Sequence, residues 1–213
     1  VYPYLVFLDL SNQLDTLTPE TYDNFVTTYH DIPLNKKLNR AWLESLAKQQ
    51  QWQTFLRYYD SATATADLIC YQGQALLTTS QHDAADLLAE KLWLVPYAQP
   101  KSCDTLFAHW IGENKLTVDL MWQRFIMAIH ADDMSVAKHV MSLMPANQQL
   151  TANLWLKVIA DPKKVTDTAL FPVKSEANND ILTEGLIRLA KQDPKKAINA
   201  WNALKQQHLF NLA

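Results

Sequence analysis

The sequence predicts an all-α protein, built as an α-solenoid or superhelix of stacked antiparallel helix pairs. Only three glycines occur in 213 residues, which argues against phosphate-cradling loops and hairpin-rich sheets, because both depend on glycine backbone freedom. Apolar side chains recur at spacings of three and four residues, the period of an amphipathic helix. The chain is long enough to bury a sizeable core, and we expect one superhelical domain over residues 1–213.

Prolines and capping residues delimit the first helices. Apolar residues over 2–14 predict a buried helix that begins at Pro3. Thr18 is the expected N-cap of a second helix, with Pro19 at its first position, and Pro33 marks the break before the third helix. The apolar positions of these three helices and of a short fourth one are Leu5, Val6, Leu8 and Leu10; Tyr22, Phe25, Val26 and Tyr29; Leu38, Ala41, Trp42, Ser45 and Leu46; and Trp52, Phe55 and Leu56.

The turn within residues 92–110 organises the middle of the chain. Pro96 and Pro100 cannot lie inside a helix, so one helix ends after Trp93 and the next begins near residue 102. Cys103 lies in this turn, and the only other cysteine, Cys70, falls in a helical pattern over 64–77. The two thiols can meet across adjacent helices in a disulfide. The alternative, a catalytic thiol and a buried one, lacks an accompanying Cys-His-Asn signature.

One spacing of small and apolar residues recurs after three short polar turns. In each case a leucine or isoleucine lies eight residues before the first alanine, on the preceding helix. The three sets are Ala85, Leu88, Ala89 and Leu92; Ala137, Val140, Met141 and Met144; and Ala197, Ala200, Trp201 and Leu204. They begin 52 and 60 residues apart, unlike the fixed period of about 34 in tetratricopeptide repeats. Small residues let paired helices approach closely, which favours a solenoid.

Composition and charge exclude several partners. The net charge is −3 with both signs interspersed, so no basic field is available for nucleic acid. No apolar run approaches the length of a membrane span, and the start of the chain lacks the basic and apolar regions of a signal peptide. We therefore expect no nucleic-acid partner and no transmembrane segment, and a signal peptide, if one existed, has been removed.

Candidate chemical residues favour structural roles. The six histidines show no metal-ligand spacing, and His130 falls where a helix is expected to end, so we expect no metal and no cofactor. The seven tryptophans fall mainly on apolar stripes, which favours core packing over stacking on carbohydrate. Glu44 is the one glutamate followed by serine, and its place in an amphipathic helix favours a surface charge over a catalytic acid.

A set of short motifs resembles the N-terminal superhelical, U-shaped domain of soluble lytic murein transglycosylases. These motifs occur in the family's order: Tyr2-Pro3-Tyr4-Leu5, Leu46-Ala47, Trp52, Cys70-Tyr71, Leu92-Trp93-Leu94, Gln99-Pro100, Cys103-Asp104, Leu106-Phe107 and Trp110. The resemblance implies a periplasmic enzyme that pairs Cys70 with Cys103. It also implies cleavage of the peptidoglycan glycan between MurNAc and GlcNAc, with formation of an anhydro sugar.

The family's catalytic motifs are missing from this sequence. A glutamate followed by serine together with Gly-Leu-Met-Gln and Ala-Tyr-Asn-Ala-Gly segments would mark its C-terminal lysozyme-like domain. We therefore expect no catalytic residue here, and an N-terminal fragment of a longer enzyme whose catalytic domain is its partner. Peptidoglycan glycan strands are a second expected partner. The alternative function is a free-standing helical-repeat adaptor that binds a protein or peptide along its groove.

Overall fold

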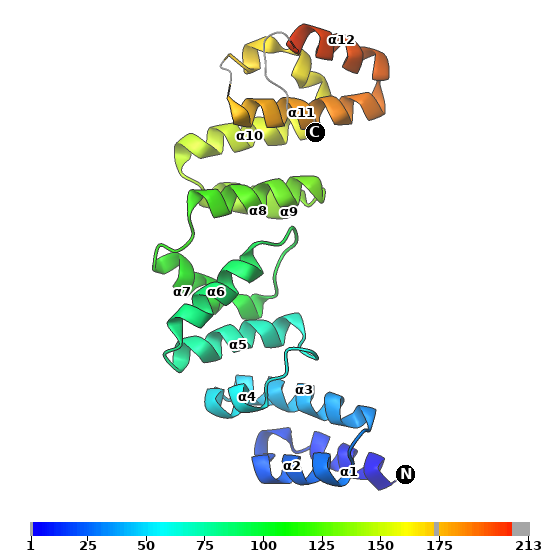
Figure 1. Cartoon of the computed structure of the whole chain (residues 1–213), viewed down its shortest axis with the longest axis vertical. Coiled ribbons are helices and arrows are strands. Elements are labelled where there is room, and N and C mark those ends of the chain that lie inside the picture. Colours follow the sequence, from blue (N-terminus) through cyan, green and yellow to red (C-terminus); the bar gives the residue numbers. More distant parts are fainter. Residues whose placement is uncertain (1, 173–174, 206–213) are drawn as a thin grey trace. The chain divides into compact units, whose positions relative to one another are not determined.

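The computed structural model describes residues 2–172 and 175–205, and within these ranges it contains twelve α-helices and no strand (Figure 1). This confirms the all-α prediction. The helices are α1 (Tyr2–Ser11), α2 (Pro19–Thr28), α3 (Pro33–Lys48), α4 (Trp52–Tyr58), α5 (Ala66–Thr78), α6 (His82–Trp93), α7 (Asp104–Gly112), α8 (Val118–His130), α9 (Met134–Leu143), α10 (Ala146–Ala160), α11 (Glu176–Gln192) and α12 (Pro194–Leu204). Four short 3₁₀ segments are η1 (Leu14–Thr16), η2 (Lys101–Cys103), η3 (Pro162–Thr166) and η4 (Thr168–Leu170).

The helices form two compact units, Val1–Leu120 and Met121–Ala213. In the first unit, α3 packs on α1 and α4, and α5 packs on α4, α6 and α7. In the second unit, α10 packs on α9 and α11, and α11 packs on α12. Each helix thus contacts mainly its neighbours along the chain, as expected for stacked helix pairs. That residues 1–213 form a single domain stays a prediction.

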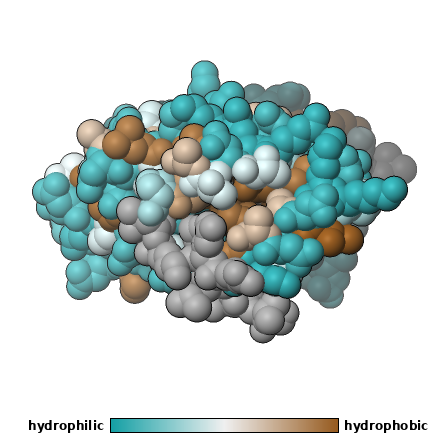
Figure 2. All heavy atoms as spheres, turned by 90° about the horizontal axis from the view of Figure 1, so that it is seen from above, coloured by the Kyte–Doolittle hydropathy of each residue, from teal (hydrophilic) through white to brown (hydrophobic). Residues whose placement is uncertain are grey.

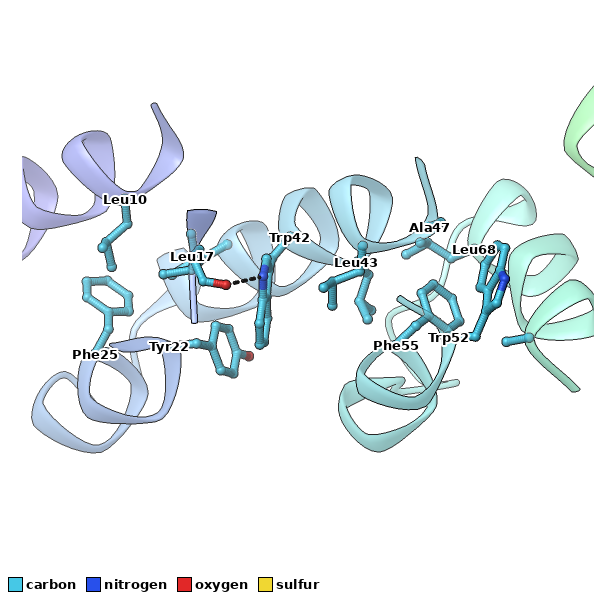
Figure 3. Close-up of a cluster of buried hydrophobic side chains, with 13 residues drawn as sticks. Leu10, Leu17, Tyr22, Phe25, Trp42, Leu43, Ala47, Trp52, Phe55 and Leu68 are labelled. Atoms are coloured by element: carbon cyan, nitrogen blue, oxygen red, sulfur yellow. Dashed lines mark hydrogen bonds between the residues drawn. The ribbon is translucent and has the colours of Figure 1, made fainter. Parts of the chain in front are cut away.

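Trp42 lies at the centre of the first unit's core. Its side chain is fully buried, and its indole Nε1 donates a hydrogen bond of 3.1 Å to the Leu17 carbonyl (Figure 3). The ring of Tyr22 stacks on the indole with 4.6 Å between centroids. Leu17 lies in the connection before α2, and Tyr22 lies on α2 itself. The tryptophan on α3 therefore fixes both the second helix and the loop that leads into it.

The predicted caps of α2 are confirmed, but the prediction of a buried first helix is wrong in part. The Thr18 side chain accepts a hydrogen bond from the Thr21 backbone N–H, and Pro19 is the first helical residue. Helix α1 ends at Ser11, and only Leu10 is buried in it. Leu5 is 56% exposed and Leu8 is 42% exposed. Because α1 is apolar on most sides, packing one side against α3 leaves apolar residues on the other.

The alanines of the recurrent spacing are buried, which confirms their role in close helix contacts. Ala85, Ala89 and Ala137 are fully buried, and both alanines of the third set, in α12, are at most 7% exposed. In the second unit Gly185 of α11 has the same role, because an added Cβ would collide with Val158 of α10 and Val165 of η3. Small residues therefore set how closely the helices of each pair approach.

Four helices end in turns of the same type, each with one residue of positive φ shortly after the helix ends. In the turn after α5, Ser80 has φ 60°, its N–H donates to the Leu77 carbonyl, and the Gln81 N–H donates to the Leu76 carbonyl at 2.8 Å. This pair of bonds is the Schellman motif. The positive-φ residues of the four turns are Gln50, Ser80, Asn114 and Asp132. None is glycine, so the usual sequence mark of this motif is missing.

Polar residues predominate on the part of the surface drawn in Figure 2, where hydrophobic residues form small separate groups. Among the described residues, no helix is both long enough and apolar enough to cross a membrane.

We predict that Ser80→Gly stabilises the protein. A left-handed backbone costs an L-residue roughly 1 to 2 kcal/mol, whereas glycine adopts it freely and loses only part of that gain to its greater unfolded-state entropy. We expect the free energy of unfolding to rise by about 0.5 to 1 kcal/mol in urea denaturation. Thr78→Gly, two residues earlier at the exposed end of α5, is the matched control and should destabilise. Equal loss of stability in both variants would contradict the prediction.

Candidate functional site

The disulfide between Cys70 and Cys103 joins α5 to the turn before α7. The two Cα atoms lie 4.7 Å apart, and both side chains are fully buried. Cys70 lies within α5, and Cys103 is the last residue of η2 and directly precedes α7. Both helix ends predicted around Pro96 and Pro100 are present, because α6 stops at Trp93 and η2 starts at Lys101. The structure thus contains the bond that the sequence and the family resemblance favoured.

Hydrogen bonds on either side of the disulfide hold the same turn on α5. The Ser102 hydroxyl donates to the Asp67 carboxylate at 2.6 Å. Two turns further along α5, the Gln74 side-chain amide donates to the Ser102 carbonyl at 2.6 Å. Asp67, Cys70 and Gln74 are spaced by three and four residues, so they lie on one face of the helix. We call residues 67–74 and 101–106 together the disulfide turn.

A glycine allows the close approach of helices at the disulfide turn. Gly73 lies three residues after Cys70, and Leu106 lies three residues after Cys103. A Cβ built on Gly73 would overlap the Leu106 side chain, which is 1% exposed. Close packing leaves Leu106 little room to move. The glycine and the disulfide therefore fix the same contact between α5 and α7.

We predict opposite effects for two glycine substitutions. Gly73→Ala should destabilise by about 1 to 3 kcal/mol, because the methyl group overpacks the contact with Leu106. Gly112→Ala is the matched control at the end of α7, where an added Cβ meets nothing within 4 Å. It should be neutral or stabilising by up to about 1 kcal/mol. Thermal unfolding of both variants tests this, and a Gly73→Ala protein as stable as wild type would refute the contact.

We predict that reduction, or Cys70→Ser with Cys103→Ser, lowers stability by roughly 3 to 4 kcal/mol. The bond joins two residues 33 positions apart and so closes a long loop in the unfolded chain, and the chain-entropy model gives this size of effect. Because each helix contacts mainly its neighbours, hydrogen exchange should accelerate first in α5, α6 and α7. The wild-type chain, denatured without reductant, should show no reactive thiol, and a titration that finds two would contradict the bond.

The second unit carries a charged cluster that sequence reasoning missed. Arg188 of α11 donates to Asp132 at 2.6 Å and to Glu184 at 2.7 Å, and it also donates to the Ile129 carbonyl at 3.2 Å. Burial opposes the charge of this guanidinium, but the two carboxylates outweigh that effect and raise the pKa of Arg188. His130 approaches Glu184, with 4.0 Å between Nε2 and Oε2. The side chains of His130, Asp132, Glu184 and Arg188 line a hollow of about 470 Å³.

A second hollow, of about 340 Å³, lies in the first unit between α2, α3 and the end of α4. Its lining includes Tyr22, Asn39, Tyr59, Lys36 and Arg57. We call it the Tyr59 hollow. Burial raises the pKa of Tyr22 and of Tyr59, so both phenols are neutral at physiological pH. The hollow thus combines aromatic rings, the amides of Asn35 and Asn39, two cations and the carboxylate of Asp60.

The candidate residues named from the sequence do not converge on one site. Glu44 is half-buried on α3, and the neighbouring Ser45 donates to Asp15 at 2.6 Å. His130 ends α8, as predicted, and the described residues contain no cluster of three or more histidine, cysteine or acidic side chains arranged to hold a metal ion. Five of the tryptophans are buried, which supports their packing role: Trp42, Trp52, Trp93, Trp110 and Trp155.

Two further features near these elements were not anticipated. Arg124 of α8 is 4% exposed, and burial lowers the pKa of its guanidinium although Asp133 opposes that effect. His82 and His109 stack with 5.9 Å between ring centroids. The burial of Arg124 could not be predicted, because the residue lies within the apolar pattern of its helix. The stacking of His82 on His109 could not be predicted either, because the two residues are 27 positions apart.

Comparison with known proteins returns soluble lytic murein transglycosylases. No family model matches the chain. The Escherichia coli K12 enzyme is 24% identical over 211 residues, which are 99% of this chain and 33% of that protein. The Salmonella typhimurium enzyme is 24% identical over 197 residues, covering 92% of the chain and 30% of that protein. The chain therefore spans about one third of the length of these relatives.

Solved structures of lytic transglycosylases are also similar to this chain. An inactive variant of the lytic transglycosylase Slt from Pseudomonas aeruginosa superposes with a TM-score of 0.84 and 33% identity, over 98% of this chain and 34% of that one. The 70-kDa soluble lytic transglycosylase in complex with bulgecin A superposes with a TM-score of 0.81 and 24% identity, over 96% of this chain and 33% of that one. The resemblance drawn from the motifs is thus confirmed: along nearly its whole length, the chain is related to an all-helical region that makes up about a third of the soluble lytic murein transglycosylases.

Proposed function

We propose that this chain is the non-catalytic helical scaffold domain of a periplasmic peptidoglycan lytic transglycosylase. In the proposed parent enzyme, a lysozyme-like domain cleaves the bond between MurNAc and GlcNAc and forms 1,6-anhydro-MurNAc. The helical units hold that catalytic domain and guide a glycan strand towards it. The observation that carries this proposal is the match of 98% of the chain to only 34% of a lytic transglycosylase structure.

The two carboxylates of the Arg188 cluster support a non-catalytic role. A glycosidase acid needs an environment that keeps its carboxyl group protonated, beside a second carboxylate. In the Arg188 cluster, both carboxylates accept hydrogen bonds from the guanidinium of Arg188. Neither Asp132 nor Glu184 therefore has the environment of a general acid. The cluster is better suited to bracing α11 against the end of α8.

The disulfide supports the assignment to the periplasm. Disulfides persist in oxidising compartments such as the periplasm, and cytosolic thiols are normally kept reduced. Cys70 and Cys103 are the only cysteines of the chain, and both are used in the bond. The relatives are murein transglycosylases by name, and murein lies in the same compartment. A free-standing adaptor, the alternative function, has no comparable support in the comparisons.

We predict that the purified chain alone releases no anhydromuramyl product from peptidoglycan, because the motifs of the catalytic domain are missing from its sequence. Chromatography of soluble muropeptides measures this, with the Escherichia coli enzyme as the positive control. Release of product above the buffer level by the purified chain would overturn the scaffold proposal.

The scaffold role itself is tested in the full-length parent. Deleting the region that corresponds to this chain should lower turnover of intact murein sacculi more than turnover of short soluble glycans, because only the long substrate needs positioning by the helical units. Equal effects on both substrates would show that the helices do not position the glycan.

A further inference from the structure

The methionines of this chain are confined to one pair of helices. Two lie on α8, two lie on α9 and the last directly follows α9: Met121, Met127, Met134, Met141 and Met144. All five belong to the second unit, whereas both cysteines belong to the first unit and are joined in the buried disulfide. Thioethers are therefore the reduced sulfur groups of this chain, and an oxidant that attacks sulfur acts first on α8 and α9.

Met121 lies on the apolar stripe of α8. It precedes the buried Phe125 by four residues and the buried Ala128 by seven, so the three side chains share one face of the helix. Met127 is rotated from Met121 by about two thirds of a turn around the helix axis and lies outside this stripe. Both methionines are half-buried, so part of each side chain is accessible to solvent. Helix α8 thus carries one accessible methionine on its packing face and one away from it.

Met141 borders the packing face of α9. It follows the fully buried Ala137 by four residues and precedes Met144, which is 3% exposed, by three. Met141 itself is half-buried. In the other two sets with this spacing, the position of Met144 is held by Leu92 and Leu204. An oxidisable side chain therefore occupies a place where the chain otherwise uses leucine.

Oxidation of a methionine on a packing face weakens that packing. A sulfoxide is polar and chiral, and burying a polar group without a hydrogen-bond donor opposes folding. The neighbours of Met121 and Met141 on their stripes are apolar side chains such as Phe125 and Ala137. A sulfoxide at either position is hydrated only if the helix moves away from its partners. A sulfoxide at Met127 is hydrated without such a movement, because this residue lies outside the stripe.

The reaction is a transfer of one oxygen atom from hydrogen peroxide to sulfur. The sulfur lone pair attacks one peroxide oxygen, so that an S–O bond forms while the O–O bond breaks. The hydroxide that leaves takes the proton of the transferred oxygen and departs as water. Sulfur loses two electrons and the peroxide gains them. Methionine sulfoxide reductases reverse this step, so the modification is not permanent.

We propose that α8 and α9 form an oxidant-responsive element, in which peroxide converts Met121 and Met141 to sulfoxides and loosens the packing of the second unit. Met144 reacts after them, because it becomes accessible only when α9 has loosened. The first unit is unaffected, since it has no methionine and its cysteines are already paired. This inference goes beyond the proposed function and does not depend on it, because it follows from the position and burial of the methionines.

The test treats the 213-residue chain with hydrogen peroxide and locates the added oxygen by peptide mass spectrometry. We expect Met121 and Met141 to be oxidised before Met144. Hydrogen exchange in α8 and α9 should then accelerate at least about fivefold, because a buried polar group without a partner lowers local stability. Exchange in α3, α4 and α5 should stay unchanged. Incubation with methionine sulfoxide reductases should restore slow exchange in α8 and α9.

Matched variants separate the packing face from a general effect of oxidation. Met121→Leu and Met127→Leu each remove one half-buried thioether from α8, and leucine nearly conserves the volume. After peroxide treatment, Met121→Leu should show a smaller acceleration of exchange in α8, whereas Met127→Leu should respond as wild type does. The variant with both Met121→Leu and Met141→Leu should lose most of the response. Thermal unfolding of the untreated variants checks that each retains its fold.

Several outcomes would overturn the inference. These are a failure of Met121 or Met141 to take up oxygen, their oxidation without faster exchange, equal responses of Met121→Leu and Met127→Leu, or oxidation of Met144 as fast as that of Met141. None of them bears on the scaffold role, which is measured separately by murein turnover in the parent. Conversely, a failed murein experiment would leave the oxidant response of the second unit intact.

Discussion

The close approach of neighbouring helices at small residues is the constraint on which the rest of this structure depends. The helices are short, and a short helix has little stability without a partner for its apolar stripe. The missing side chain of Gly73 leaves room for Leu106, and that of Gly185 leaves room for Val158 and Val165. The buried Ala85 and Ala89 lie on α6, which packs on α5. A larger residue at such a position would push the pair apart and expose the stripes of both helices.

Much of this arrangement could be predicted from the sequence because its signals are local. Thr18 and Pro19 mark a helix start, and Pro96 and Pro100 mark a turn, through steric and capping rules that act within a few residues. The Schellman turns escaped prediction because residues such as Gln50 hold the position that glycine usually marks. The exposure of Leu5 also escaped it, since periodicity cannot tell which side of a uniformly apolar helix finds a partner.

The polar features could not be predicted, since they depend on which helices meet. Arg188 lies 56 residues after Asp132, and Tyr59 lies 24 residues after Asn35, with no motif linking either pair. The two groups of charged residues differ in their ion pairing. Arg188 pairs with two carboxylates and braces the fold, whereas Lys36 and Arg57 form no ion pair with a described residue, although Asp60 lines the same hollow.

The bond between Cys70 and Cys103 also limits how far the chain can be extended. Because the bridged Cα atoms stay 4.7 Å apart, the segment between two cysteines that are 33 positions apart cannot contribute its contour length. At 3.3 to 3.6 Å per extended residue, this removes roughly 110 to 120 Å from the reach of the chain under tension. Helices outside the loop can unfold pair by pair under tension. The disulfide bypasses α6 and the turn after it, so the pulling force does not act on them. When the two ends of the chain are pulled apart, the segment between the two cysteines therefore carries no tension.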